Sequence, residues 1–97
     1  MQYFYRAHCA PEVVLEAARR FFGARGFAPG WSGADRQRFT DQRGAVDVRT
    51  EGEGGHYTRV TVGTAELAES ELDKLAKRFL AELHAREEPG YVVRGAY

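Results

Sequence analysis

The chain has 97 residues, of which 43% are apolar and 12% aromatic, and this suffices for the core of one small domain. Lysine and arginine together number 14, as do aspartate and glutamate, so the formal net charge at pH 7 is zero. That balance argues against a strongly basic nucleic-acid-binding protein.

The cysteine content and the hydropathy of the sequence exclude further classes of protein. Cys9 is the only cysteine, so neither an intramolecular disulfide nor a thiolate metal cluster can form. The sequence shows no secretory-type opening segment and no apolar run of membrane-spanning length. We therefore expect a cytoplasmic protein without a membrane partner and without a metal or other cofactor.

The first predicted elements are a strand and a helix. Residues 3–9 alternate with period two, which places Phe4, Arg6 and His8 on one face of a strand and Cys9 on the other, buried face. Residues 11–22 follow a helical period that opens on Pro11. A glycine, at position 23 or 26, is expected to end this helix.

Three strands are predicted in the middle of the chain, over residues 36–41, 45–51 and 56–63. Tight turns join them at residues 41–44, with Gly44 at a positive φ, and at residues 52–55. The irregular residues 27–34 either form a short edge strand around Trp31 or contain no regular element, and the sequence does not decide between the two. The inward-facing apolar residues are Phe39, Val46, Val48, Val60 and Val62.

The longest periodic segment, residues 66–85, predicts an amphipathic helix. Its apolar stripe consists of Leu72, Leu75, Ala76, Phe79, Leu80 and Leu83. Its solvent face consists of Glu69, Asp73, Lys74, Lys77, Arg78 and Glu82. The start is open by one turn, because Thr64 and the pair Ser70 and Asp73 are both candidate caps. Pro89 prevents continuation, so residues 1–88 form the expected domain and residues 89–97 a loose tail or a short extra strand.

The predicted order β-α-(β)β-β-β-α implies an α+β fold, with one antiparallel sheet of four or five strands and two helices on one face. The long helix would lie across the inward-facing valines and Phe39. In element order the chain resembles the helix-grip and TATA-binding-protein-like group, including short "half" versions of START-like ligand-binding domains. The resemblance implies a pocket for an apolar ligand between the long helix and the sheet, although at this size we expect side chains to fill that space.

No motif in the sequence predicts catalysis. The segment around Ser32 superficially matches a nucleophile elbow but lacks the helix that must follow the serine. The glycines at residues 52–55 lack the pattern of a phosphate-binding loop. His8, His56 and His84 have no ligand-like spacing. His8 and Cys9 point to opposite faces of a strand and cannot pair with each other. We expect a protein that is not an enzyme.

The remaining candidate is a surface, the sheet face that carries arginines and aromatic rings. Its candidate binding residues are Phe4, Arg6, His8, Arg36, Arg38, Arg49, Tyr57 and Arg59, with Trp31 and Tyr91 as possible edge contacts. Such a face suits a protein interface, including a homo-oligomer, or single-stranded nucleic acid. A plain solvated face is the alternative, because Asp47 and Glu51 could neutralise the arginines across the strands.

Overall fold

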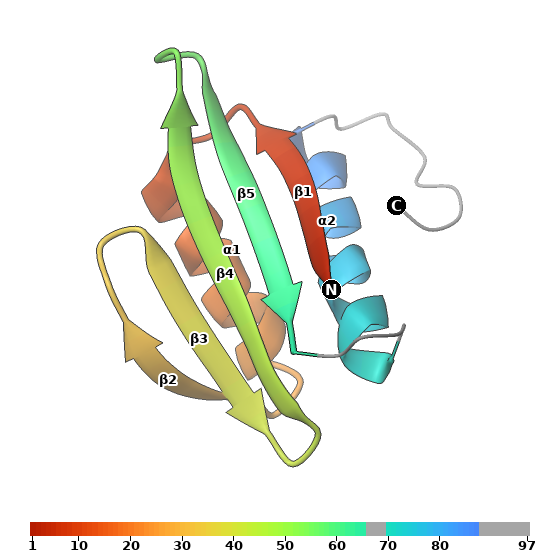
Figure 1. Cartoon of the computed structure of the whole chain (residues 1–97). Helices are drawn as coiled ribbons and strands as arrows, with labels where there is room; N and C mark the ends of the chain where they lie inside the picture. The colour runs from red at the N-terminus through yellow and green to blue at the C-terminus, as the bar shows by residue number, and fades with distance from the viewer. Residues whose placement is uncertain (66–69, 88–97) are drawn as a thin grey trace.

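The computed structural model describes residues 1–65 and 70–87 and shows one antiparallel sheet with two helices (Figure 1). The predicted α+β class and element order are confirmed, and the segment around Trp31 does form a strand. The elements are β1 (Gln2–Ala7), α1 (Pro11–Gly23), β2 (Ala28–Ser32), β3 (Arg36–Asp41), β4 (Gly44–Glu53), β5 (Tyr57–Thr64) and α2 (Glu71–Glu87).

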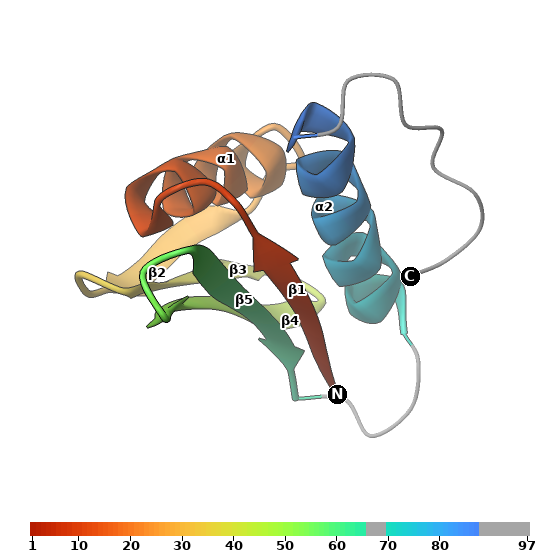
Figure 2. The same ribbon diagram turned by 90° about the horizontal axis from the view of Figure 1, so that it is seen from above.

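The strand order is β1-β5-β4-β3-β2, and every neighbouring pair is antiparallel. The hairpin between β3 and β4 closes on the pair Asp41 and Gly44, and Gly44 has the predicted positive φ, 138°. The next hairpin turns through Gly54 and Gly55, whose φ angles of 61° and 75° are strained for residues with a side chain. Both helices lie on the same face of the sheet (Figure 2), so among residues 1–65 and 70–87 no element covers the opposite face.

The inward-facing valines form a fully buried floor, as predicted, but the two helices share it. The two helices on one face were predicted, and the structure adds that α1 covers the part of the floor on β3 and β4. α1 lies over β3 and β4, and α2 lies over β5 and β1 (Figure 1). Phe39 stacks on Phe22 of α1, with 5.0 Å between ring centroids. The first helix takes this share because its own stripe contains two adjacent phenylalanines, Phe21 and Phe22, which are 7% and 0% exposed.

The start of α2 agrees with one of the two predicted caps, the pair Ser70 and Asp73. The helix begins at Glu71, and the predicted turn before it falls on residues 66–69, outside the described residues. Ser70 and Asp73 form a reciprocal cap: the Ser70 N–H donates to Asp73 Oδ2 (3.0 Å) and Asp73 N–H donates to Ser70 Oγ (3.4 Å). Asp73 is 0% exposed, so its assignment to the solvent face is wrong. A capping side chain turns back over the helix start, here toward β1 and β5.

The strand β1 is shorter than predicted, and His8 and Cys9 lie beyond its end. Glu87 Oε2 accepts the N–H groups of both residues, each at 2.9 Å, which replaces the pairing that a longer strand would supply. Cys9 is therefore partly exposed rather than buried, contrary to prediction. The predicted tail with Tyr91 lies outside the described residues. Neither described helix has the length and apolar character needed to cross a bilayer.

Candidate functional site

The uncovered face of the sheet carries the three exposed aromatic rings of the described residues. Phe4 on β1, Trp31 on β2 and Tyr57 at the start of β5 are 48%, 47% and 42% exposed. The inward face of the sheet holds residues that are almost completely buried, such as Val48 on β4 and Val62 on β5, both 0% exposed. Exposed rings gathered on one face are typical of a contact surface rather than of scattered surface residues.

Each of these rings has a guanidinium group beside it. The Arg59 Cζ atom lies 4.5 Å from the Phe4 centroid. Arg38 approaches Trp31 to 5.5 Å, and Arg6 approaches Tyr57 to 5.7 Å. Guanidinium groups within about 6 Å of a ring make favourable cation–π contacts. These contacts hold the rings in place without covering them.

The structure brings the predicted residues together as one surface with two clusters. The first cluster contains Phe4, Arg6, His8, Tyr57 and Arg59, with the His8 ring centroid 5.2 Å from that of Tyr57. The second contains Trp31, Arg36, Arg38 and Arg49, on β2, β3 and β4. A cross-strand row from Arg36 through Arg49 and Thr61 to Phe4 connects them. We call the whole surface the open face.

Acidic side chains neutralise part of the open face. Arg38 donates two hydrogen bonds to Asp47, at 2.7 and 2.9 Å, as the sequence suggested. Arg36 binds Asp35 at 3.1 Å, and this hydrogen bond lowers the pKa of the Asp35 carboxyl. Glu51 is the register partner of Arg59, yet neither residue makes an ion pair with any described residue. The face therefore keeps unpaired charges of both signs.

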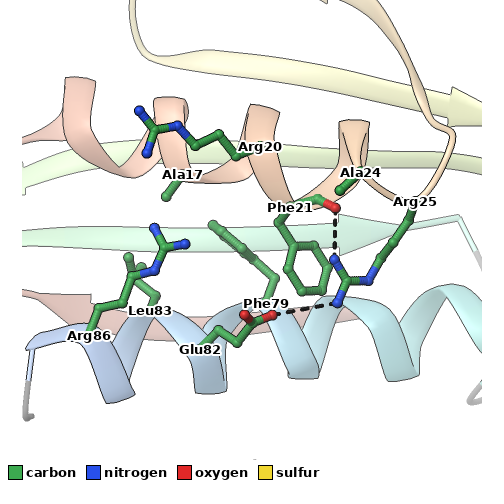
Figure 3. Close-up of a pocket in the computed structure, with 9 residues that line it drawn as sticks. All are labelled: Ala17, Arg20, Phe21, Ala24, Arg25, Phe79, Glu82, Leu83 and Arg86. Carbon is green, nitrogen blue, oxygen red and sulfur yellow. Dashed lines mark hydrogen bonds and ion pairs between the residues drawn. The ribbon is translucent and has the colours of Figure 1, made fainter.

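A second concavity lies between the helices, on the far side of the molecule (Figure 3). It has a volume of about 200 Å³, and Arg20, Arg25 and Arg86 are among the residues that line it. Arg25 packs 3.6 Å above the Phe21 ring and reaches Glu82 at 3.7 Å. Phe79 and Leu83 on its floor are only 2% and 3% exposed, so an occupant would bury little additional apolar area. We interpret this groove as the seam between two packed helices.

A cluster of titratable side chains at the end of α2 is absent from the sequence prediction. The Tyr5 hydroxyl donates to Glu87 Oε1 at 2.6 Å and lies 3.2 Å from His84 Nδ1. Burial alone would raise the pKa of Glu87, but hydrogen bonds from Tyr5, Cys9 and the backbone outweigh it and lower that pKa. These residues are about eighty positions apart, so no local pattern could indicate the cluster. The cluster links the end of α2 by hydrogen bonds to β1 and to the residues just before α1.

The same cluster makes Cys9 a poor nucleophile. Burial, followed by a hydrogen bond to Glu87 and the negative charge of that carboxylate, raises the pKa of the Cys9 thiol from 9.0 to about 11. The thiolate, which is the reactive form, is therefore scarce at neutral pH. Among the described residues no group of three His, Cys, Asp or Glu side chains is arranged to hold a metal ion.

Cys9 is expected to react with a thiol reagent such as DTNB about a hundredfold more slowly than free cysteine at pH 8, because the thiolate fraction falls tenfold per pKa unit. The rate should still be rising at pH 10, and Glu87→Gln should increase it at pH 8. Since Cys9 is the only cysteine, the signal has one source. Glu82→Gln, an exposed change on the same helix, is the control. A rate that levels off near pH 9 would contradict the raised pKa.

The open face carries the three exposed Phe, Trp and Tyr rings of the described residues, together with Arg49, Glu51 and Arg59, which form no ion pair with a described residue. No protein-family model matches the chain, and no curated protein matches its sequence.

Proposed function

We propose that the protein is a binding module rather than an enzyme, and that the open face is the surface with which it contacts another macromolecule, in the first place a second copy of itself. The observation that carries the proposal is the concentration of the exposed rings on this face, each beside an arginine. Tyrosine, tryptophan, phenylalanine and arginine are the residues enriched in protein interfaces.

A second copy suits the charges of the face. Glu51 and Arg59 are adjacent on neighbouring strands but form no ion pair with each other. In a two-fold symmetric dimer, if one residue of the first copy touches a second residue of the other copy, the same two residues also touch with the copies exchanged. A second copy could therefore offer its Glu51 to Arg59 and its Arg59 to Glu51. The rings of Phe4 and Tyr57 lie next to this pair and would be buried with it.

The edge of the sheet is the second candidate contact, and it would use β1. The Thr64 N–H donates to the Met1 carbonyl at 2.8 Å, and the Met1 amino group donates to the Thr64 carbonyl at 2.9 Å. Bonding alternates along an antiparallel pair, so the backbone groups of Gln2, Phe4 and Arg6 point away from β5. In the described chain these outward groups have no backbone partner. The other edge, β2, contains Pro29 and an irregular register, which discourage strand addition.

Light scattering after size-exclusion chromatography, over a series of concentrations, tests this proposal. We expect a mass that rises toward that of a dimer. Tyr57→Ser should weaken association at least about fivefold, because removing an interface ring commonly costs 1 kcal/mol or more. Val13→Ser is the matched control, since Val13 is 54% exposed but lies on α1, on the covered side of the sheet.

The variant Gln2→Pro distinguishes association through the open face from association through the β1 edge. It removes an outward N–H of β1 and leaves the exposed rings unchanged. We expect this variant to associate like the unmodified protein if the face is the contact. A protein that stays monomeric at millimolar concentration, or a dimer that Gln2→Pro abolishes and Tyr57→Ser does not affect, would contradict the assignment to the face.

A further inference from the structure

A shallow depression in the open face lies between Trp31 and the two arginines Arg36 and Arg49. Its volume is about 260 Å³, and its floor includes Thr61 and Gly63 of β5. We propose that this depression binds one nucleotide unit of a single-stranded nucleic acid, with the base stacked on Trp31 and a phosphate held by Arg36 and Arg49. The inference rests on the proposed role of the open face as a contact surface and names a ligand class for one part of it.

The Trp31 ring is in contact with an arginine that is itself held in place. Arg38 lies 5.5 Å from the ring centroid, and Asp47 fixes its guanidinium with two hydrogen bonds. Gly30 allows this arrangement, because a Cβ atom there would lie 3.1 Å from Arg38 Cγ. The ring is thus held by a charge-paired side chain while 47% of the residue remains exposed. A base stacked on such a ring contributes about 1–3 kcal/mol.

The charges at the depression favour an anion. Arg36 and Arg49 are direct register partners on β3 and β4, an arrangement in which like charges repel. Asp35 binds Arg36, whereas Arg49 has no ion pair with any described residue. The Asp47 carboxylate also borders the depression, but both of its oxygens are engaged by Arg38. Adjacent guanidinium groups are well suited to a phosphate, since each presents several donors in a fixed plane.

The size and openness of the depression favour part of a single-stranded nucleic acid over an enclosed small molecule or a free nucleotide. About 260 Å³ lies below the usual range of enclosed small-molecule pockets, and the depression is open to solvent. The row from Arg36 and Arg49 continues through Thr61 to Phe4, a second exposed ring on the opposite edge strand, about 19 Å from β2 at about 4.8 Å per strand, which could receive a base a few nucleotides further along. An extended chain of nucleotides can use both rings, whereas a free nucleotide can use one. Only a few phosphates would be contacted, so the affinity should depend only modestly on salt. The logarithm of the association constant should fall against the logarithm of the salt concentration with a slope of about −1.4 for two phosphates.

Trp31 is the only tryptophan, so its intrinsic fluorescence reports on the site directly. The titration uses oligothymidylate of about 12 nucleotides, a length within the site sizes of known single-strand binders. We expect quenching of Trp31 and a slope near the predicted value. Arg36→Gln and Arg49→Gln should each weaken binding about tenfold. Arg19→Gln, an exposed arginine on α1, is the matched control and should bind like the unmodified protein.

Three results would overturn the inference: no quenching at low salt, equal weakening by the α1 control, or thymidine monophosphate binding as tightly as the oligonucleotide. The last result would assign the site to a free nucleotide. Circular dichroism confirms that each variant is folded. The titration is made at a protein concentration where light scattering shows only monomer. Failure of this site therefore leaves self-association through the open face standing, and failure of self-association leaves this site to be judged by its own titration.

Discussion

Replacing Phe22 with alanine is expected to lower the free energy of unfolding by about 3–5 kcal/mol, the usual cost of removing a fully buried phenylalanine. Phe22 is 0% exposed and lies at the junction of both helices and the sheet. Its ring centroid lies 4.9 Å from that of Phe21, 5.0 Å from Phe39, 5.3 Å from Phe27 and 5.6 Å from Phe79. No small shift of one element could fill the space left by the ring.

Urea unfolding followed by helical circular dichroism measures this loss. Val13→Ala on the same helix is the control and should change stability by less than about 0.5 kcal/mol, because Val13 is 54% exposed. Phe22→Leu, which keeps most of the volume, serves if the alanine variant does not fold, and should cost about 1 kcal/mol. A loss below 1 kcal/mol for Phe22→Ala would show that Phe22 is not the centre of the core.

Replacing Asp73 with alanine is expected to cost about 3 kcal/mol, because it removes a buried acceptor and leaves several partly buried donors without it. Tyr3 and Thr64 donate their hydroxyls to Asp73 Oδ1 at 3.0 and 2.8 Å. Ser70 donates its N–H and its hydroxyl to Oδ2 at 3.0 and 2.8 Å. One carboxylate therefore joins β1, β5 and the first turn of α2. Glu71→Ala, two residues earlier and exposed, is the control and should have little effect.

The contribution of Asp73 should depend on pH with a definite sign. Burial alone would raise its pKa, but hydrogen bonds from Ser70, Thr64 and Tyr3 outweigh burial and lower it below 3.8. A carboxylate with a lowered pKa stabilises the fold fully above its ordinary value, and this stabilisation is lost as the pH falls through the folded-state pKa. The stability difference between the unmodified protein and Asp73→Asn should thus be constant from pH 7 to about 5 and shrink below about pH 4. A difference that grows on acidification would contradict the lowered pKa.

Periodicity alone predicted most of the fold. Alternation in β3, β4 and β5 assigned the inward valines correctly, and the residues between them necessarily form the open face. Helical spacing identified the stripes of α1 and α2. It could not assign Asp73, because a capping residue near a helix start is positioned by its hydrogen bonds rather than by the helical repeat. The resemblance to the helix-grip group stays a prediction.

The candidate site was predicted as a set of residues but not as an arrangement. Alternation placed Arg36, Arg38 and Arg49 on one face. Which arginine pairs with which acid depends on register, and register made Asp47 the partner of Arg38. The approach of Trp31 to Arg38 depends on the irregular pairing of β2 with β3. The cluster around Glu87 required contacts between segments at opposite ends of the sequence.

We propose above all that the open face contacts a second copy of the chain, while the helices only stabilise the sheet. The most direct test is a dilution series of two-dimensional amide spectra of the ¹⁵N-labelled protein. On raising the protein concentration, we predict shifts at Phe4, Tyr57 and Arg59 and none along the outer surfaces of α1 and α2. Spectra that do not change with concentration, or shifts confined to the helices, would contradict the account.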